Sequence, residues 1–331
     1  MATDTMDMVI RYRAGAICRD SVMPAAPGPG EVRYRVAAFA LNRSELLFAD
    51  DRHYVPRLDG ARLGYEACGM VDAVGPDVVA MAIGDKVSSI PFASDAYGVN
   101  GGWAVTPAEW LAPWPSALSA AEACSVWMQY LTAYFPLFEL TPVGHGDAII
   151  VSAASSSAAI GACQLARIRG ARVIGLTRRS SKRAALLKIG YDAVVASDEV
   201  ADLAEAIDAA AAGHPIRLSY DAVCGDLIGR YAGALASGAT IFAYGNLSGD
   251  AEVRLPLIAG VRGDLRLHAY STPNFSHDPA RRAKALAVIT PLLESGALRP
   301  VLDRCYAFAD WQHAYARLRS GDQIGKIVVT I

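Results

Sequence analysis

The stretch "IIVSAASSSAAIGACQLA" (149–166) decides the fold class of this chain. Apolar residues 148–151 read as a buried strand, and the small residues that follow lead into an amphipathic helix. A strand, a tight turn and a helix in this order form the element that binds a dinucleotide pyrophosphate in parallel α/β sheets. Such turns usually contain glycine, whereas this one contains Ser155, Ser156 and Ser157. The sequence therefore raises the question of whether a serine turn binds the same group.

Strands and helices alternate along the region that begins with this stretch. The expected strands are 148–153, 171–177, 192–197, 216–223 and 239–245, and the expected helices are 157–169, 180–189, 199–212 and 226–236. Alternation of this kind predicts a doubly wound parallel sheet whose strands are joined by right-handed crossovers. This part of the chain is therefore expected to be an α/β domain.

The first third of the chain has a different pattern. Residues 31–41 alternate between apolar and polar, as a half-buried strand does, and residues 67–78 and 84–91 combine apolar runs with Gly and Pro turns. Closely spaced strands of this type predict a β-barrel-like domain. The last segment, 296–331, ends in the strand "GKIVVTI", which is expected to return to this first domain.

A helix is expected between the two regions, over residues 118–140, because apolar residues recur there at helical spacing. Ser119 is a suitable N-cap. Glu122 stands three residues later, where a capping box places its glutamate.

Composition limits the class of protein. With 331 residues, 53% of them hydrophobic, the chain can bury a large core and is long for one domain. The net charge of −2 and the lack of charge runs give no sign of a nucleic-acid partner. Neither a membrane-length apolar stretch nor a secretory signal is visible, and six scattered cysteines support neither structural zinc nor disulfides. We expect a soluble, cytoplasmic protein.

The serine turn is suited to a pyrophosphate for a physical reason. Ligands of doubly wound sheets lie at the carboxyl ends of strands, where helix N-termini present N–H groups to anions. Close approach requires small residues, and 155–157 and Ala158 are small. Serine hydroxyls can also bind phosphate oxygens or cap the helix. Gly161 is expected to let the helix pack closely on the sheet. The alternative is an ordinary N-capped helix.

The loop after the second strand indicates which dinucleotide binds. NAD-binding folds place an Asp or Glu about 20 residues beyond the phosphate turn, where it binds the ribose 2′-hydroxyl. This chain has "GLTRRSSKR" (175–183) there, without a carboxylate. Arg178 and Lys182 suit a 2′-phosphate, because cations form charge-assisted hydrogen bonds with it, and the Thr177 hydroxyl can also donate to it. The loop favours NADPH over NADH. The alternative is a solvated basic helix start, although cations there oppose the helix dipole.

Several motifs occur in an order that resembles one family. They are "ALNRSELL" (40–47), "LGYEACGMVDAVGPDV" (63–78), "GDKV" (84–87), "WMQYLTAY" (127–134), the serine turn, "TRRSSKR" (177–183), "YGNLSG" (244–249) and "IGKIVV" (324–329). Together they resemble the medium-chain dehydrogenase/reductase superfamily, in its zinc-free, quinone oxidoreductase-like branch. The implied fold is α/β, with a GroES-like β-barrel catalytic domain (1–122), a Rossmann doubly wound parallel-sheet domain that binds NADPH (123–270), and a C-terminal segment (271–331) that returns to the catalytic domain.

The resemblance also implies a site without a metal. Zinc alcohol dehydrogenases have a Cys ligand where this chain has Asn42 and a His ligand where it has Tyr65. Glu66 remains, but one carboxylate does not form a zinc site. Without a metal, a conjugated enone or a quinone is easier to reduce than a simple ketone, because the charge spreads to the carbonyl oxygen as an enolate. The implied activity is NADPH-dependent reduction of an activated C=C bond or a quinone.

The catalytic candidates are Asn42, Tyr54 and Tyr65. Asn42 and Tyr54 match active-site positions of the quinone-reductase branch, and both can donate hydrogen bonds to an oxyanion. Each also has a structural reading, as a turn cap or a loop aromatic. The side chain of Tyr65 either points into the expected substrate cleft or packs beneath that cleft. Whether a tyrosine, His53 or water supplies the proton stays open.

Further contacts follow from the resemblance alone. Gln129 and Thr132 are expected near the nicotinamide end of the cofactor, and Tyr244, Asn246 and Lys326 near its nicotinamide half or ribose. A homodimer is the expected assembly. The expected partner is a small-molecule substrate, whose pocket is shaped by the loops 48–62, 92–103 and 268–282.

Two other functions stay open. One is a tailoring enzyme of secondary metabolism that reduces an enoyl or iminium group or carries out a non-redox cyclisation. The other is an NADPH-binding protein without catalysis.

Overall fold

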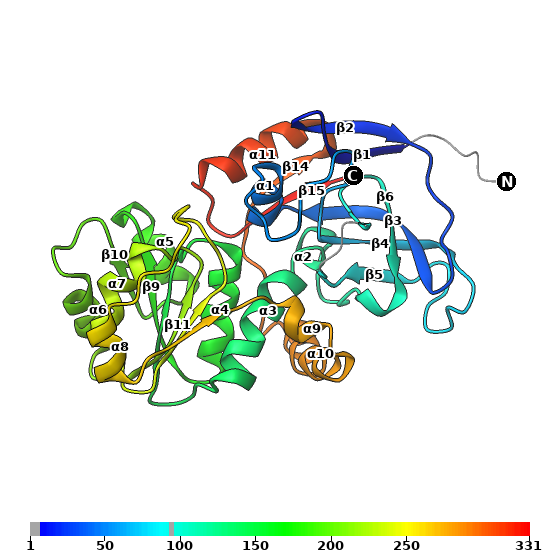
Figure 1. Ribbon diagram of the computed structural model, residues 1–331. Coiled ribbons are helices and arrows are strands. Elements are labelled where there is room, and N and C mark those ends of the chain that lie inside the picture. The colour runs from blue at the N-terminus through cyan, green and yellow to red at the C-terminus, as the bar shows by residue number, and fades with distance from the viewer. Residues whose placement is uncertain (1–6, 93–95) are drawn as a thin grey trace. The chain divides into compact units, whose positions relative to one another are not determined.

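The computed structural model describes residues 7–92 and 96–331 and divides the chain into two compact units (Figure 1). The first unit contains Met1–Met128 together with Leu286–Ile331, and the second contains Gln129–Ala285. The boundaries expected from the sequence lie at 122/123 and 270/271. Residues 93–95 of the expected pocket loop 92–103 lie outside the described residues.

The first unit is built mainly from strands. Its strands are β1 (Asp7–Arg13), β2 (Ala16–Val22), β3 (Glu31–Ala40), β4 (Glu66–Val74), β5 (Lys86–Ser89), β6 (Trp103–Pro107), β7 (Leu111–Pro113), β14 (Leu302–Ala307) and β15 (Lys326–Thr330). Its helices are α1 (Arg43–Ala49), α2 (Ala120–Ala123) and α11 (Trp311–Ser320), with short 3₁₀ turns η1 (Ala108–Trp110) and η5 (Phe308–Asp310). The unit boundaries fall within α3 (Trp127–Tyr134) and α10 (Pro279–Glu294).

A seven-stranded sheet holds this unit together. Its order is β14-β15-β3-β4-β5-β7, with β6 also paired to β3, while β1 and β2 form a separate hairpin. β15 pairs antiparallel with β3, with Val329 opposite Phe39, which confirms the expected return of the last strand. The alternation predicted for β3 is present, because Val32, Tyr34 and Val36 are buried in one core with side chains of α1 and α11.

The second unit alternates strands with helices. Its strands are β8 (Ala148–Val151), β9 (Arg172–Thr177), β10 (Ala193–Ala196), β11 (Ile216–Asp221), β12 (Thr240–Ala243) and β13 (Arg266–Ala269). Its helices are α4 (Ser157–Ile168), α5 (Arg183–Ile189), α6 (Leu203–Ala211), α7 (Asp226–Tyr231), α8 (Leu257–Gly263) and α9 (Pro273–Ser276), with short turns η3 (Ser180–Lys182) and η4 (Ala232–Ala234).

The six strands of this unit are parallel, in the order β10-β9-β8-β11-β12-β13, which confirms the doubly wound sheet. Helices lie on both sides of the sheet (Figure 1), so every residue of β8 is buried. The chain order reverses between β8 and β11, and ligands of such sheets bind at that point. The edge strand β13 was not expected, because "RLHA" (266–269) is only four residues long; it is largely exposed in the structure.

The helix expected over 118–140 is broken after α2. The Ser125 hydroxyl donates to the Glu122 carbonyl at 2.8 Å, which gives this carbonyl a partner outside the helical pattern. The capping box formed by Ser119 and Glu122 is confirmed.

The end of this segment also departs from a regular α-helix. The π-helix η2 (Phe135–Leu140) follows α3 directly and has a proline near its start. Pro136 lacks an N–H and its ring crowds the preceding turn, so the hydrogen-bonding pattern changes there.

Within residues 7–92 and 96–331, no helix combines the length and the apolar character that crossing a membrane requires.

Candidate functional site

The serine turn joins β8 to α4 at the carboxyl edge of the parallel sheet. Ser156 is the N-cap of α4, and its hydroxyl accepts the Ala159 N–H at 3.2 Å. Ser157 begins the helix and Ala158 follows it; residues 155–158 are all half-buried. The first N–H groups of a helix have no partners within it. The turn therefore presents helix amides and serine hydroxyls at the expected place.

Lys182 connects the basic loop to the serine turn. Its Nζ donates to Ser155 Oγ at 3.0 Å, although the two residues are 27 positions apart in the sequence. Thr177, at the end of β9, is half-buried, and Arg178 in the following loop is exposed. The two motifs that the sequence indicated separately thus lie at one edge of the sheet.

A carboxylate from elsewhere in the chain also reaches this loop. Glu199 accepts the Ser180 N–H at 3.0 Å, and the bonds to Ser180, with a smaller effect of Arg179, hold the pKa of Glu199 below its ordinary value. The Arg183 guanidinium donates to the Val194 carbonyl. Cations at this helix start are therefore compensated within the chain and do not by themselves require a bound anion.

A buried carboxylate that sequence reasoning missed ties the ends of β8 and β11 together. Asp221 Oδ1 accepts the Ser152 hydroxyl at 2.7 Å. The same oxygen accepts the N–H groups of Val223 and Cys224, at 2.7 and 2.9 Å. Its Oδ2 accepts the Tyr231 hydroxyl at 2.7 Å. A fully buried charge needs such complete hydrogen bonding. The only sequence signal is one acidic residue at the end of an apolar strand.

Tyr244 follows β12 at the same edge. Its ring stacks on Tyr220, with centroids 4.0 Å apart. Its hydroxyl is buried and makes no hydrogen bond of normal geometry to the described residues. Burial raises the pKa of Tyr244, and the nearby hydroxyls of Tyr220 and Ser156 oppose this rise. Gly245 is required next, because a Cβ there would lie 2.6 Å from the Ala222 carbonyl oxygen. A buried hydroxyl of this kind calls for an additional partner.

The remaining cofactor candidates of this unit are Asn246, Gln129 and Thr132. Asn246 Oδ1 accepts the Gly249 N–H at 3.1 Å and so shapes its own turn. Gln129 and Thr132 are buried on α3. The expectation that Gly161 lets α4 pack on the sheet is wrong, because its missing Cβ would lie 3.1 Å from the Gln129 carbonyl oxygen. The glycine allows α4 to approach α3 instead.

These features together fit a dinucleotide phosphate. The start of α4 supplies N–H groups, Lys182 supplies a cation beside Ser155, and Tyr244 supplies a buried hydroxyl in need of a partner. All three lie at the carboxyl ends of strands around the point where the chain order reverses.

Lys326, Glu66 and Asn42 form a buried polar network in the first unit. Lys326 Nζ lies 2.6 Å from Glu66 Oε2 and donates to Asn42 Oδ1 at 2.7 Å. Asn42 Nδ2 donates to Glu66 Oε2 and to the Ala40 carbonyl, each at 3.2 Å. Glu66 Oε1 accepts the Met128 N–H at 2.7 Å. The Lys326 and Glu66 side chains are each only 1% exposed.

This network gives two predicted site residues specific partners. The amide nitrogen of Asn42 already donates twice, so Asn42 is held in place and is not a free donor. The ammonium group of Lys326 is bound to Glu66 and Asn42, so it has a structural role here, and its contact with the cofactor stays a prediction.

Tyr54, His53 and Tyr65 lie close together in the same unit. Tyr54 is 66% exposed and stacks on His53, with centroids 4.3 Å apart. The Tyr65 ring is 6.4 Å from His53. His53 Nδ1 accepts the Val55 N–H at 3.1 Å, so the neutral ring carries its proton on Nε2. Burial lowers the pKa of His53, which favours this neutral form.

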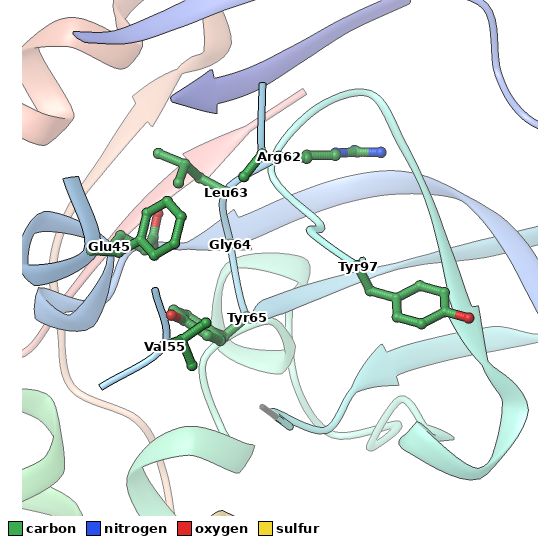
Figure 2. Close-up of a pocket in the computed structure, with 9 residues that line it drawn as sticks. Glu45, Val55, Arg62, Leu63, Gly64, Tyr65 and Tyr97 are labelled. Atoms are coloured by element: carbon green, nitrogen blue, oxygen red, sulfur yellow. The ribbon is translucent and has the colours of Figure 1, made fainter. Parts of the chain in front are cut away.

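A pocket beside Tyr65 has about 370 Å³ of empty space, part of it open to solvent. Figure 2 shows Glu45, Val55 and Tyr65 gathered on one side of it, whereas the side chains of Arg62 and Tyr97 point away. The complete lining consists of Glu45, Phe48, Val55, Ala61, Arg62, Leu63, Gly64, Tyr65 and Tyr97. Tyr65 therefore borders a cavity, one of the two placements open to it.

Two family models match successive parts of the chain. The alcohol dehydrogenase GroES-like domain matches residues 28–116, and the zinc-binding dehydrogenase domain matches residues 159–277. In the part of the chain that the structure describes, no group of three or more His, Cys, Asp or Glu side chains is placed to hold a metal ion.

The chain is similar to curated relatives of at least two kinds. The chain is 28% identical over 321 residues to a phenolphthiocerol/phthiocerol polyketide synthase of Mycobacterium tuberculosis, covering 96% of this chain but only 14% of that protein. It is 26% identical over 308 residues to the quinone oxidoreductase of Pseudomonas aeruginosa, covering 92% of this chain and 93% of that protein. The chain thus spans a small part of its polyketide synthase relatives and nearly all of the quinone oxidoreductase.

The structure is similar over its whole length to a solved quinone oxidoreductase. The Escherichia coli quinone oxidoreductase, solved in complex with NADPH, superposes with a TM-score of 0.87 at 24% identity, covering 98% of this chain and 100% of that one. The chain belongs to the medium-chain dehydrogenase/reductase superfamily and is quinone oxidoreductase-like.

Proposed function

We propose that the protein is an NADPH-dependent, metal-independent reductase that transfers hydride to an activated C=C bond or a quinone. The hydrogen bond from Lys182 to Ser155 carries the cofactor part of this proposal. It brings a cation to the pyrophosphate turn, in a loop without the acidic residue that binds an NAD ribose. The relatives that are quinone oxidoreductases and polyketide synthases support a reductase of this type.

In this proposal the first unit stabilises the developing oxyanion. Bound NADPH supplies the hydride. Because Asn42 is held by Glu66 and Lys326, the phenol groups of Tyr54 and Tyr65 are the donors best placed to serve the substrate oxygen. The reducing cytoplasm is the proposed location, since all six cysteines are free and Cys305 is exposed.

The direct test is turnover by the purified protein with EDTA present. NADPH is mixed with a panel of one quinone, one simple enone and one enoyl thioester, and the loss of nicotinamide absorbance is followed. The proposal expects oxidation of NADPH, slower oxidation of NADH, and no effect of the chelator. Loss of all activity on chelation, or no turnover of any panel member, contradicts it.

Tyr54→Phe separates this proposal from a non-catalytic NADPH-binding protein. The variant is expected to lower kcat and leave the Kd of NADPH unchanged, because only a donor to the oxyanion is lost. Tight NADPH binding by the wild-type protein with no turnover supports the non-catalytic alternative instead.

A tailoring role in secondary metabolism is the second candidate. The observation in its favour is that polyketide synthase segments align with 96% of this chain. An enoyl thioester turned over much faster than the quinone favours this role. Product formation without NADPH consumption indicates a non-redox step.

We further propose a homodimer formed through the β13 edge of the parallel sheet. β13 is the last strand in the order, and the neighbouring α8 exposes Leu257, Ile258 and Val261. An edge strand offers unpaired backbone groups to a second copy, and an adjoining apolar patch adds buried area.

The double substitution Ile258→Asp and Val261→Asp is expected to convert the dimer to a monomer, because it places two charges in the apolar patch. Light scattering coupled to size-exclusion chromatography measures the mass, which should fall by half. Val79→Asp, at an exposed position of the first unit, is the matched control and should leave the mass unchanged. A monomeric wild-type protein, or a dimeric double variant, refutes this interface.

A further inference from the structure

Glu45 is a buried carboxyl group to which no role has yet been given. It lies in the first turn of α1, where its Oε1 accepts the Asn42 N–H at 2.8 Å as part of a capping box. Its Oε2 accepts the Tyr315 hydroxyl at 2.6 Å and the Asn100 amide at 2.7 Å. Only 1% of the residue is exposed. The capping box accounts for one oxygen, whereas residues distant in the sequence bind the other.

Glu45 and Tyr65 line the same pocket, on the same side of it (Figure 2). Burial raises the pKa of Tyr65, and a negative charge on Glu45 raises it further. Two buried acids that border one cavity are not both ionised readily, because each charge disfavours the other. A proton lost by Tyr65 is therefore replaced most easily when Glu45 is still protonated.

The surroundings of Glu45 keep it partly protonated near neutral pH. Burial raises its pKa to about 7, against the hydrogen bonds from Tyr315, Asn42 and Asn100 and the positive charge of Lys326. These groups belong to α11, the start of α1, the loop before β6 and the start of β15. The positive charge of Lys326, which is paired with Glu66, is the smallest of these effects on the pKa of Glu45.

We propose that Glu45 is a positioning residue that stores a proton and passes it, through water in the pocket, to Tyr65 during the reduction. The inference rests on the proposed function. Hydride adds to the β-carbon of the enone, and the electron pair of the C=C bond moves to the carbonyl oxygen as an enolate. The enolate oxygen then takes the phenol proton of Tyr65, forming an O–H bond and leaving a phenolate, and the resulting enol tautomerises to the ketone.

The return of the proton closes the cycle. The Tyr65 phenolate takes a proton from pocket water, which takes the proton of the Glu45 carboxyl group. A phenolate is a stronger base than a carboxylate, so this transfer runs downhill. Glu45 regains a proton from solvent through the open side of the pocket. The pocket has room for water molecules beside the polar groups of Glu45 and Tyr65.

The test is the pH profile of kcat for Glu45→Gln. In the wild-type protein, kcat should fall as the pH rises through about 7, because the stored proton is lost. The Gln variant keeps polar atoms at this position but has no proton to give. At pH values below neutral, kcat of this variant should be at least roughly 10-fold lower than that of the wild-type protein. Its kcat should not fall further as the pH rises through neutrality. Its KM for NADPH should not change.

Two further variants separate proton storage from a structural role. Glu45→Asp should restore part of kcat and the fall near neutral pH, since it restores a titrating carboxyl group. Glu122→Gln is the matched control, because Glu122 is the capping-box glutamate of α2 and does not line the pocket. It should leave the pH profile as in the wild-type protein.

The possible results are distinct. A Glu45→Gln protein that turns over with the wild-type pH profile overturns the inference and leaves the proposed function intact. The same holds for a Glu45 carboxyl group that titrates in its ordinary acidic range, seen as the infrared carbonyl difference between wild type and Glu45→Gln. If the wild-type protein reduces no member of the panel, the proposed function fails and the proton-storing role fails with it.

Discussion

Replacement of Lys326 by methionine is expected to lower the free energy of unfolding by about 3–5 kcal/mol, because it leaves the Glu66 carboxylate buried without its partner. Methionine fills the space of the lysine stem, so the effect reports the lost charge and not a cavity. Denaturation with urea, followed by circular dichroism, measures it. Lys326 and Glu66 lie 2.6 Å apart and are nearly inaccessible to solvent, which is the condition for a cost of this size.

Two controls make this measurement specific. Adding Glu66→Gln to Lys326→Met should recover much of the loss, since no unpaired charge remains. Arg254→Met breaks an ion pair that is 2.8 Å long but exposed. The free energy of unfolding of this variant should stay within about 1 kcal/mol of the wild-type value. If breaking the buried pair and breaking the exposed pair lowered the free energy of unfolding equally, burial would not determine how much an ion pair contributes to stability.

The double substitution Arg178→Ala and Lys182→Ala is expected to raise the Kd of NADPH at least roughly 10-fold and to leave the Kd of NADH nearly unchanged. The two cations are proposed to bind the 2′-phosphate, which NADH lacks. Isothermal titration or fluorescence of the bound nicotinamide measures both constants. Lys188→Ala is the matched control, because Lys188 is an exposed lysine in the last turn of α5, whereas Lys182 precedes that helix.

A parallel loss of NADPH and NADH binding in this double variant would mean that the loop acts on the pyrophosphate and not on the 2′-phosphate. No change in either constant would remove the basis for NADPH preference. Because Glu199 already caps this loop, the loss of two cations is not expected to unfold it.

The parallel sheet could be predicted because its pattern is local. Strand β8 is apolar at every position and is followed by small residues and a periodic helix, so its place in a buried sheet follows from period and length. The proximity of the basic loop to the serine turn also follows, since the carboxyl ends of neighbouring parallel strands meet at one edge; the specific bond from Lys182 to Ser155 does not. Strand β13 could not be predicted, because alternation over only four residues is too short to stand out from the surrounding sequence.

The polar network of the first unit could not be predicted from the sequence. Lys326 and Asn42 are 284 positions apart, and no local pattern pairs a terminal lysine with the cap of the first helix. The same is true of Glu45, whose capping-box role is local but whose bond to Tyr315 spans 270 positions. Asn42 and Tyr65 were identified by resemblance, whereas the groups that surround them were found only in the folded chain.

The most direct test of the central proposal is the transfer of deuterium from NADPH labelled on the reactive face of its nicotinamide. The label should appear on the β-carbon of the reduced enone or enoyl thioester, with one NADPH oxidised for each product formed. Mass spectrometry and NMR of the product measure both quantities. Product without the label, or product formed without oxidation of NADPH, would contradict the assignment of this protein as a hydride-transferring reductase.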